Sequence, residues 1–244
     1  MNKIILSISV LFLSFATVAT AQESEERIKE LALEAILENP EIIAEAIQIL
    51  QNREKEQQAQ SAAEIFDANR DVFLSADNAP IIGNPNGDVT IVEFFDYNCS
   101  YCRRAFNAVR DVIADDQNVR VVMREFPILG PGSDFAARAS LAAMKQEKYV
   151  EFHWALMDSK IAAYSIKEEG VMEVAKQVGL DVAQLEADMK DPAIDEHISV
   201  TREFASALNF GGTPAFIIGN ELVPGFVDKE VIETLIEQAR NEQG

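Results

Sequence analysis

The sequence is poor in cysteine, with two in 244 residues. A secreted protein that depends on disulfides spreads more cysteines along the chain, because a bridge stabilises most when it closes a long loop. Cys99 and Cys102 enclose only Ser100 and Tyr101, so a bridge between them restrains almost nothing in the unfolded chain. The pair is therefore predicted to serve chemistry and not stability.

Histidine is equally scarce, with two residues. Basic residues are also few relative to acidic ones. Lys and Arg number 21 against 41 Asp and Glu, for a formal net charge of −20. Such a surface repels nucleic acid and anionic lipid, so we expect neither as a partner. The two histidines, His153 and His197, stand apart in segments predicted to be helical. They do not complete a zinc site with the cysteines, and we expect no metal and no bound cofactor beyond a redox-active disulfide.

Long apolar runs are missing as well. The longest begins at Ile4, after Lys3, and is shorter than the about 20 residues that span a bilayer. It leads to the small residues Ala19-Thr20-Ala21, a pattern typical of a cleaved export signal. We predict that residues 1–21 are a signal peptide and that the mature chain, from Gln22, works in the periplasm without a stable membrane anchor. An uncleaved anchor is the alternative.

Residues 22–60 are predicted to form a helical oligomerisation arm and linker. Apolar residues recur at helical spacing on both sides of Asn39-Pro40, which breaks the pattern; the larger ones are Ile28, Leu31, Ile36, Ile43, Ile47 and Leu50. From Gln51 to Gln60 the only apolar residue is Ala59, so this stretch offers no face for packing. We expect the arm to join copies of the chain as a dimer or trimer. The alternative is that its helices fold back onto the core.

Residues 61–244 read as one α/β domain. Two β-rich runs, Val89–Phe95 and Val119–Phe126, flank a helical pattern at 101–114 and predict a β–α–β unit with parallel strands. The later segments are a helical block at about 130–208, short strands at 215–218 and 222–223 around Gly219-Asn220, and a helix at 228–240. This order is a thioredoxin fold with an inserted helical domain.

The dithiol lies where the first strand passes into a helix. Positions i and i+3 at a helix start are close enough for a disulfide. The first sulfur faces unpaired backbone N–H groups and the positive end of the helix, which favour the thiolate. Cys99 is therefore the expected nucleophile, and Cys102 the resolving thiol. A zinc site, an inert structural disulfide and an incidental pair of buried thiols are the alternatives.

Glu93 is unusual for its place in the strand. A strand covered on both faces is normally apolar throughout, yet this acid stands six residues before Cys99. Burial would raise its pKa and let it exchange a proton with Cys102. An exposed carboxylate at a sheet edge is the other interpretation.

These motifs resemble a known family. The run Glu93–Cys102 resembles the active-site strand and helix start of DsbA-like periplasmic oxidoreductases, and Phe152–Met157 resembles a helix of their inserted domain. Gly212-Thr213-Pro214-Ala215-Phe216 looks like their cis-proline loop. The resemblance covers about 80–244 and implies a cis Pro214 beside Cys99, with Thr213 contacting an extended substrate. The arm is similar to extensions of dimeric and trimeric members that act as disulfide isomerases, such as the DsbC-like and ScsC-like proteins.

The residues between the cysteines indicate a direction of reaction. In the strong oxidases of this family a histidine precedes the second cysteine and stabilises the thiolate, whereas Tyr101 holds that position here and carries no positive charge. Ser100-Tyr101 resembles the dipeptides of isomerase-like members, and Thr213 before the expected cis proline also resembles those members. We therefore expect a disulfide isomerase or reductase that binds unfolded or misoxidised exported proteins through Ser100, Tyr101, Thr213 and Pro214 and exchanges electrons with a membrane redox partner. A dithiol oxidase and a non-enzymatic chaperone module are the alternatives.

Overall fold

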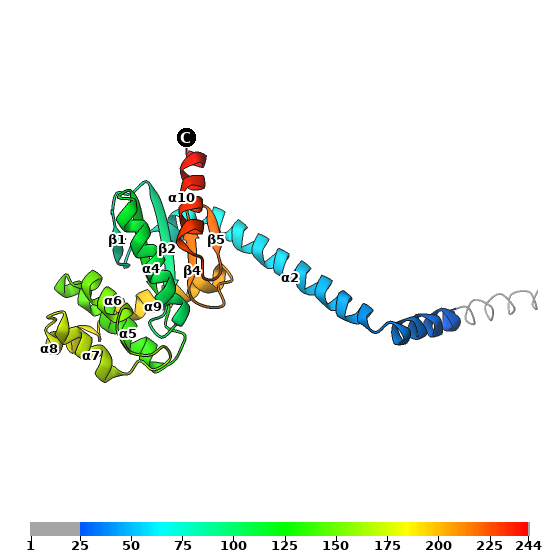
Figure 1. Ribbon diagram of the computed structural model, residues 1–244, viewed down its shortest axis with the longest axis horizontal. Helices are drawn as coiled ribbons and strands as arrows, with labels where there is room; N and C mark the ends of the chain where they lie inside the picture. Colours follow the sequence, from blue (N-terminus) through cyan, green and yellow to red (C-terminus); the bar gives the residue numbers. More distant parts are fainter. Residues whose placement is uncertain (1–24, 244) are drawn as a thin grey trace, which may run out of the picture. The chain divides into compact units, whose positions relative to one another are not determined.

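The computed structural model describes residues 25–243, and Figure 1 shows the chain. The chain divides into two compact units, the first ending at Gln57 and the second beginning at Gln58. The predicted signal peptide at 1–21 lies outside the described residues. The boundary is three residues before the end of the predicted arm.

The described part of the first unit is helical. One helix covers residues 25–38, and α2 covers Glu41–Ala68. The break at Asn39 is confirmed: the Asn39 side-chain amide donates to the carbonyl of Ala35 at 3.1 Å, and Pro40 has no N–H to continue the ladder. The polar stretch from Gln51 onward is part of α2. Most large apolar side chains of the unit are exposed, and Ile36 is half-buried. The exposed ones include Ile28, Leu31, Leu37, Ile43, Ile47 and Leu50.

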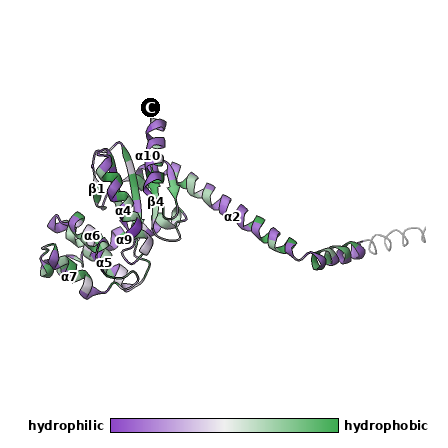
Figure 2. Cartoon of the chain, in the orientation of Figure 1, coloured by the Kyte–Doolittle hydropathy of each residue, from purple (hydrophilic) through white to green (hydrophobic). Residues whose placement is uncertain are grey.

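A five-stranded sheet forms the centre of the second unit. Its strands are β1 (Ile81–Gly83), β2 (Val89–Phe95), β3 (Val119–Glu125), β4 (Ala215–Ile218) and β5 (Glu221–Val223), in the order β1-β3-β2-β4-β5. The parallel pairing of β2 with β3 and the β4–β5 hairpin are confirmed. Strand β1, antiparallel to β3, was not predicted, because three residues before a turn are too few to show an alternating pattern. The central strands are largely green in Figure 2 because most of their residues are apolar.

Helices cover both faces of this sheet. On one face lie α4 (Ser100–Asp115) and α10 (Lys229–Gln243), packed against each other and against the central strands. The other face contacts α3 (Arg70–Leu74) and α9 (Pro192–Ala207). Each face of the sheet has its own hydrophobic core: the first core lies beneath α4 and α10, and the second beneath α3 and α9. Because strand side chains alternate, Ile91 and Phe95 of β2 lie in the first core, and Val92 and Phe94 lie in the second.

The helical insertion between β3 and β4 is confirmed. It contains α5 (Pro131–Ala143), the short 3-10 helix η1 (Met144–Gln146), α6 (Tyr149–Met157), α7 (Glu168–Gln177), α8 (Val182–Asp188) and α9. Asp191 caps α9 by accepting the N–H of Ala193 at 2.9 Å, with Pro192 in the first turn. Helix α7 begins after Lys167 without a side-chain cap.

The C-terminal end of α2 is anchored in the second core, and this anchor gives the first prediction. Phe66 is 1% exposed and its ring lies 6.0 Å from that of Phe73, whereas its neighbour Ile65 is 36% exposed. Phe66→Ala should lower the free energy of unfolding of the second unit by about 3–5 kcal/mol, because it leaves a cavity. Ile65→Ala is the matched control and should cost under about 1 kcal/mol. Urea titration of the full chain measures both, and equal losses would contradict the anchor.

Candidate active site

Cys99 lies where the sheet meets a helix. Strand β2 ends at Phe95, residues 96–98 form a turn, and Cys99 caps α4 with an extended backbone, φ −80° and ψ 121°. Its N–H donates to the carbonyl of Asp96 at 3.0 Å. Cys102 follows in the first turn of the helix. Cys102 is fully buried and Cys99 is 4% exposed, and both are free thiols.

The environment separates the two sulfurs in acidity. The pKa of Cys99 is lowered to about 6, chiefly because the Cys102 thiol donates a hydrogen bond to it. The Thr213 side chain and backbone N–H groups of the helix start lower it further, and burial opposes them. The pKa of Cys102 is raised well above its usual range by burial and by the neighbouring Cys99. At neutral pH, Cys99 is therefore mainly a thiolate while Cys102 keeps its proton.

The loop before β4 lies against Cys99. The pairing of Ala215 with Phe94 fixes the start of β4 next to the end of β2. As a result the Cys99 sulfur lies 3.2 Å from the carbonyl oxygen of Thr213. The Thr213–Pro214 peptide bond is cis, as the resemblance implies. Thr213 is half-buried while Gly212 is exposed, so the loop offers backbone groups to a chain that approaches the sulfur.

Ser100 and Tyr101 face solvent at the start of α4. Ser100 is exposed, and 52% of Tyr101 is exposed. The structure therefore brings together Cys99, Cys102, Ser100, Tyr101, Thr213 and Pro214 at one end of the sheet. Their roles in binding a substrate stay predictions.

Glu93 lies in β2 behind the dithiol. Strand alternation places it with Ile91 and Phe95 on the face that α4 covers. It is 2% exposed, and burial raises its pKa to about 8. Among the described residues no hydrogen bond joins its carboxyl to Cys102, whose sulfur accepts the N–H of Asp96 at 3.5 Å. Its proton exchange with Cys102 stays a prediction.

Asp96 anchors the turn before Cys99, a role that the sequence analysis missed. It is 1% exposed, and one carboxylate oxygen accepts the N–H of Asn98 at 2.8 Å and the hydroxyl of Ser133 at 2.7 Å. The other accepts the N–H groups of Ile128 and Leu129 at 2.9 and 3.0 Å. The Asp96 side chain thus connects the turn to the segment that follows β3 and to the helical insertion.

Asn98 ties the same turn to a later segment. Its amide donates to Ser133 at 3.1 Å, and its side-chain oxygen accepts the N–H of Ile166 at 3.0 Å. Its backbone carbonyl accepts the N–H of Tyr164 at 3.0 Å. A Cβ on Gly132 would lie 2.0 Å from the carbonyl oxygen of Ile166, so glycine is required where these segments meet. The insertion therefore helps to set the position of Cys99.

A second buried acid, Glu125, lies at the end of β3. Tyr97 and Tyr149 each donate a hydroxyl to one of its carboxyl oxygens at 3.1 Å, and Tyr97 also lies 2.9 Å from Nδ1 of His153. Burial raises the pKa of Glu125 well above its usual range, with smaller contributions from Asp96 and Glu93. Burial lowers the pKa of His153 to about 3, so His153 is neutral at neutral pH and Glu125 is held towards its protonated form.

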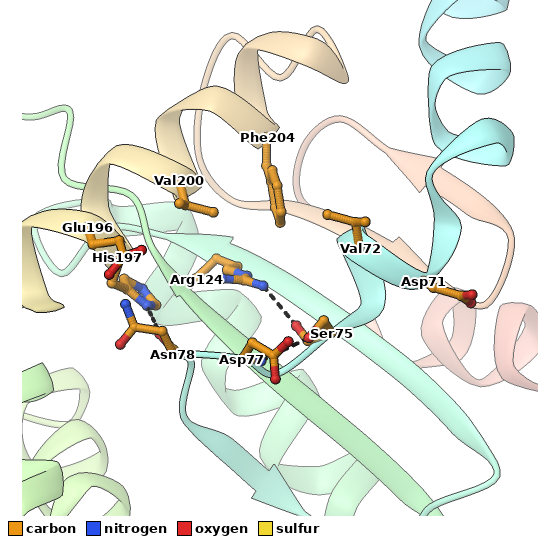
Figure 3. A pocket seen from close by; sticks show the side chains of 10 residues that line it. All are labelled: Asp71, Val72, Ser75, Asp77, Asn78, Arg124, Glu196, His197, Val200 and Phe204. Atoms are coloured by element: carbon orange, nitrogen blue, oxygen red, sulfur yellow. Dashed lines mark hydrogen bonds between the residues drawn. The ribbon is translucent and has the colours of Figure 1, made fainter.

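A pocket on the other face of the sheet, beside α3 and α9, is lined by none of the dithiol residues. It has a volume of about 380 Å³ and lies between α9, β3 and the segment after α3 (Figure 3). At its base Arg124 donates to the carbonyl of Ser75 at 2.8 Å and stacks over Phe204 at 5.0 Å. The Nε of Arg124 has no partner among the described residues and is closed to solvent. A molecule in the pocket therefore cannot reach that nitrogen.

Residues 25–243 offer neither a metal site nor a membrane-spanning helix. No group of three or more His, Cys, Asp and Glu side chains in this part of the chain is placed to hold a metal ion. No helix in it is long and apolar enough to cross a bilayer.

A model of the DSBA-like thioredoxin domain matches residues 90–237. The chain belongs to this family. A thioredoxin-like oxidoreductase from Silicibacter pomeroyi DSS-3 is 51% identical, covering 71% of this chain and 98% of its own, with a TM-score of 0.68. The thiol-disulfide exchange protein alpha-DsbA2 from Wolbachia pipientis is 29% identical over 75% of this chain and 97% of its own, with a TM-score of 0.67.

Two further proteins are similar to this chain over different shares of its length. Proteus mirabilis ScsC in a transitional conformation is 25% identical and covers 89% of this chain and 95% of its own, with a TM-score of 0.65. The resemblance to ScsC-like proteins is thus confirmed. A Na(+)/H(+) antiporter NhaA from Herminiimonas arsenicoxydans is 30% identical over 164 residues, 66% of this chain. The chain spans about a quarter of the length of such antiporters, 25% in this one.

The hydrogen bond between the two sulfurs gives a prediction about Cys99. Cys102→Ala removes the donor that contributes most to the low pKa, so the pKa of Cys99 should rise from about 6 and less thiolate should be present at neutral pH. Cys102→Ser keeps a hydroxyl donor and is the matched variant with a smaller rise. The pH dependence of Cys99 alkylation by iodoacetamide measures both. A midpoint that stays at about 6 in Cys102→Ala would show that other groups lower it.

Glu93 gives a prediction about stability and pH. Between pH 4.5 and about 8 the folded chain keeps a proton on Glu93 that the unfolded chain releases, so stability falls as the pH rises through this window. Glu93→Gln should remove about 5 kcal/mol of that fall. Part of the fall should persist, because the pKa of Glu125 is raised too.

Urea titrations from pH 4.5 to 8 test this prediction. Glu151→Gln, at an exposed position of α6, is the control and should leave the pH dependence as it is in the native chain. An unchanged fall in Glu93→Gln would mean that Glu93 is ionised in the folded protein.

Proposed function

We propose that this DsbA-like protein is a thiol–disulfide oxidoreductase that rearranges or reduces disulfides in exported proteins. The observation that carries the proposal is the unequal pair of sulfurs: the pKa of Cys99 is lowered to about 6, while that of the fully buried Cys102 is raised. The 51% identity to a thioredoxin-like oxidoreductase supports it.

The chemistry follows from the geometry. The Cys99 thiolate attacks one sulfur of a client disulfide, which forms a mixed disulfide and releases the other client sulfur as a thiolate. In reduction, Cys102 loses its proton and attacks the Cys99 sulfur, which releases the second client thiol and leaves the Cys99–Cys102 disulfide. In isomerisation, a client thiolate attacks the mixed disulfide instead and returns Cys99. Because Cys102 holds its proton strongly, the mixed disulfide persists long enough for this second outcome.

Glu93 is the group that we propose to take the proton of Cys102. Burial holds its pKa at about 8, so a carboxylate is accessible at neutral pH and a proton can return from it. An ordinary carboxylate would be too weak a base for a thiol whose pKa is high.

Tyr101 favours isomerase or reductase activity over strong oxidase activity. Its phenol carries no positive charge next to the dithiol, and the helix start with the Cys102 hydrogen bond lowers the pKa of Cys99 only to about 6. Since the stability of the thiolate sets how oxidising a disulfide is, the Cys99–Cys102 disulfide is expected to be a moderate oxidant. The lowered pKa itself favours the second candidate, a dithiol oxidase, which would oxidise reduced peptides faster than it repairs scrambled ones.

The arm is the second support for an isomerase. Its apolar side chains, such as Ile47 and Leu50, are about half exposed, at 49% and 62%. A contiguous apolar surface of this kind is typical of an interaction site. We propose that a second copy of the arm covers it and that several dithiols then face one client, which raises their effective concentration. Export through residues 1–21, work in the periplasm and exchange with a membrane redox partner are parts of the same proposal.

Variants of the full chain can distinguish the contribution of the arm to activity from that of the dithiol. Ile47→Asn with Leu50→Asn should convert the oligomer to a monomer and abolish most recovery of scrambled ribonuclease, while the reduction of a small disulfide peptide persists. Gln48→Asn with Gln51→Asn, on the same helix, is the matched control and should change neither. Solution mass and ribonuclease activity are the two measurements.

Each other outcome has a definite meaning. A monomer with full isomerase activity would remove the arm from the proposal. Rapid oxidation of reduced peptide with little ribonuclease recovery by the native chain would favour the oxidase. A Cys99→Ser variant that keeps all activity would leave only a chaperone module.

A further inference from the structure

Arg104 stands out among the basic residues near the dithiol because, among the described residues, its guanidinium forms neither an ion pair nor a hydrogen bond. Its neighbour Arg103 donates to the carbonyls of Tyr97 and Ser159, at 3.4 and 2.9 Å. Arg110 pairs with Asp158 at 3.0 Å. Arg104 is exposed in a chain of net charge −20, and its guanidinium forms no ion pair among the described residues.

Two aromatic rings hold Arg104 in place. Its guanidinium lies 4.4 Å from the centre of the Phe226 ring and 5.6 Å from that of Tyr101, and the two rings are 6.1 Å apart. Tyr101 and Arg104 share one face of α4 because they are three residues apart. A guanidinium stacked in this way keeps its N–H groups free at the edge of its plane, where they match a carboxylate. We call Tyr101, Arg104 and Phe226 the lip.

The lip lies at the dithiol. Tyr101 is two residues beyond Cys99 at the start of the same helix, and Phe226 lies in the segment between β5 and α10. Asp228, at the end of that segment, accepts the N–H of Val231 at 3.2 Å, and Lys229, the first residue of α10, pairs with Glu233 at 3.4 Å. A client cysteine held at Cys99 therefore brings its flanking residues near the unpaired guanidinium of Arg104.

We propose that the lip recognises client segments that carry an acidic side chain next to the reactive cysteine. The inference rests on the proposed function and names the class of client that it favours. Long-range attraction by a chain of net charge −20 would by itself favour basic clients. The lip reverses this preference at the point of contact, where a planar guanidinium can bind the carboxylate through two hydrogen bonds.

The test uses two peptides of the form Gly-X-Cys-X-Gly, with X either Asp or Lys, each joined by a disulfide to thionitrobenzoate. The Cys99 thiolate attacks the peptide sulfur, the S–S bond breaks, and coloured thionitrobenzoate leaves with the electron pair. Cys102 then gives up its proton and attacks the Cys99 sulfur, so the peptide leaves as a thiol and the dithiol becomes a disulfide. Single-turnover rates of the reduced full chain, each divided by the rate with glutathione, give the Asp-to-Lys ratio.

The variants are chosen so that net charge is matched. Arg104→Glu should lower the Asp-to-Lys ratio about fivefold relative to the native chain at about 0.15 M salt, the scale of one exposed ion pair. Arg110→Glu makes the same change in net charge on another side of α4 and should leave the ratio unchanged. Arg104→Lys keeps the charge without the planar stack and should give an intermediate ratio.

Three results would overturn the inference. An unchanged ratio in Arg104→Glu would show that the lip does not contact the client. An equal fall in Arg110→Glu would assign the preference to the overall field of the protein. If neither peptide reacts with the native chain faster than with Cys99→Ser, the proposed function itself fails, a result distinct from the first two.

Discussion

The carboxylate of Asp96 is the contact on which the active site depends. It accepts four hydrogen bonds, from Asn98, Ser133, Ile128 and Leu129, within a buried site. Its backbone meanwhile binds both cysteines, through the carbonyl to the N–H of Cys99 and through the N–H to the sulfur of Cys102. Side-chain and backbone contacts of one residue thus connect the helical insertion to the dithiol, so a shift of the insertion is transmitted directly to the sulfurs.

Burial acts in opposite directions on the groups around this contact. The carboxyls of Glu93 and Glu125 are held towards their protonated forms and His153 towards its neutral form, so the core beneath α4 carries little charge at neutral pH. The Cys99 thiolate therefore lies at the end of a core in which these three side chains are held towards their uncharged forms. The thiolate is stabilised by hydrogen bonds from the helix start and Cys102.

The sequence predicts what depends on local pattern. Parallel β2 and β3, the turn at Gly219 and the place of the dithiol all follow from short-range spacing. Contacts between distant segments are beyond such a pattern: Tyr97, Glu125 and His153 meet across 28 and 56 residues of sequence. The Asp96 anchor was also missed, although an acid beside a Cys-x-x-C motif was visible. Its partners Ile128 and Leu129 donate backbone N–H groups. Almost every residue type has such a group, so the amino-acid sequence does not indicate these contacts.

The order of these partners along the chain has a consequence for timing. Cys99 and Cys102 are synthesised before Ser133, Ile166 and Thr213, whose contacts complete their surroundings. Until Thr213 has been synthesised and has folded against Cys99, one of the groups that lower the pKa of this thiol is missing. A nascent or truncated chain therefore carries a weaker nucleophile than the complete domain and is less able to attack neighbouring unfolded proteins.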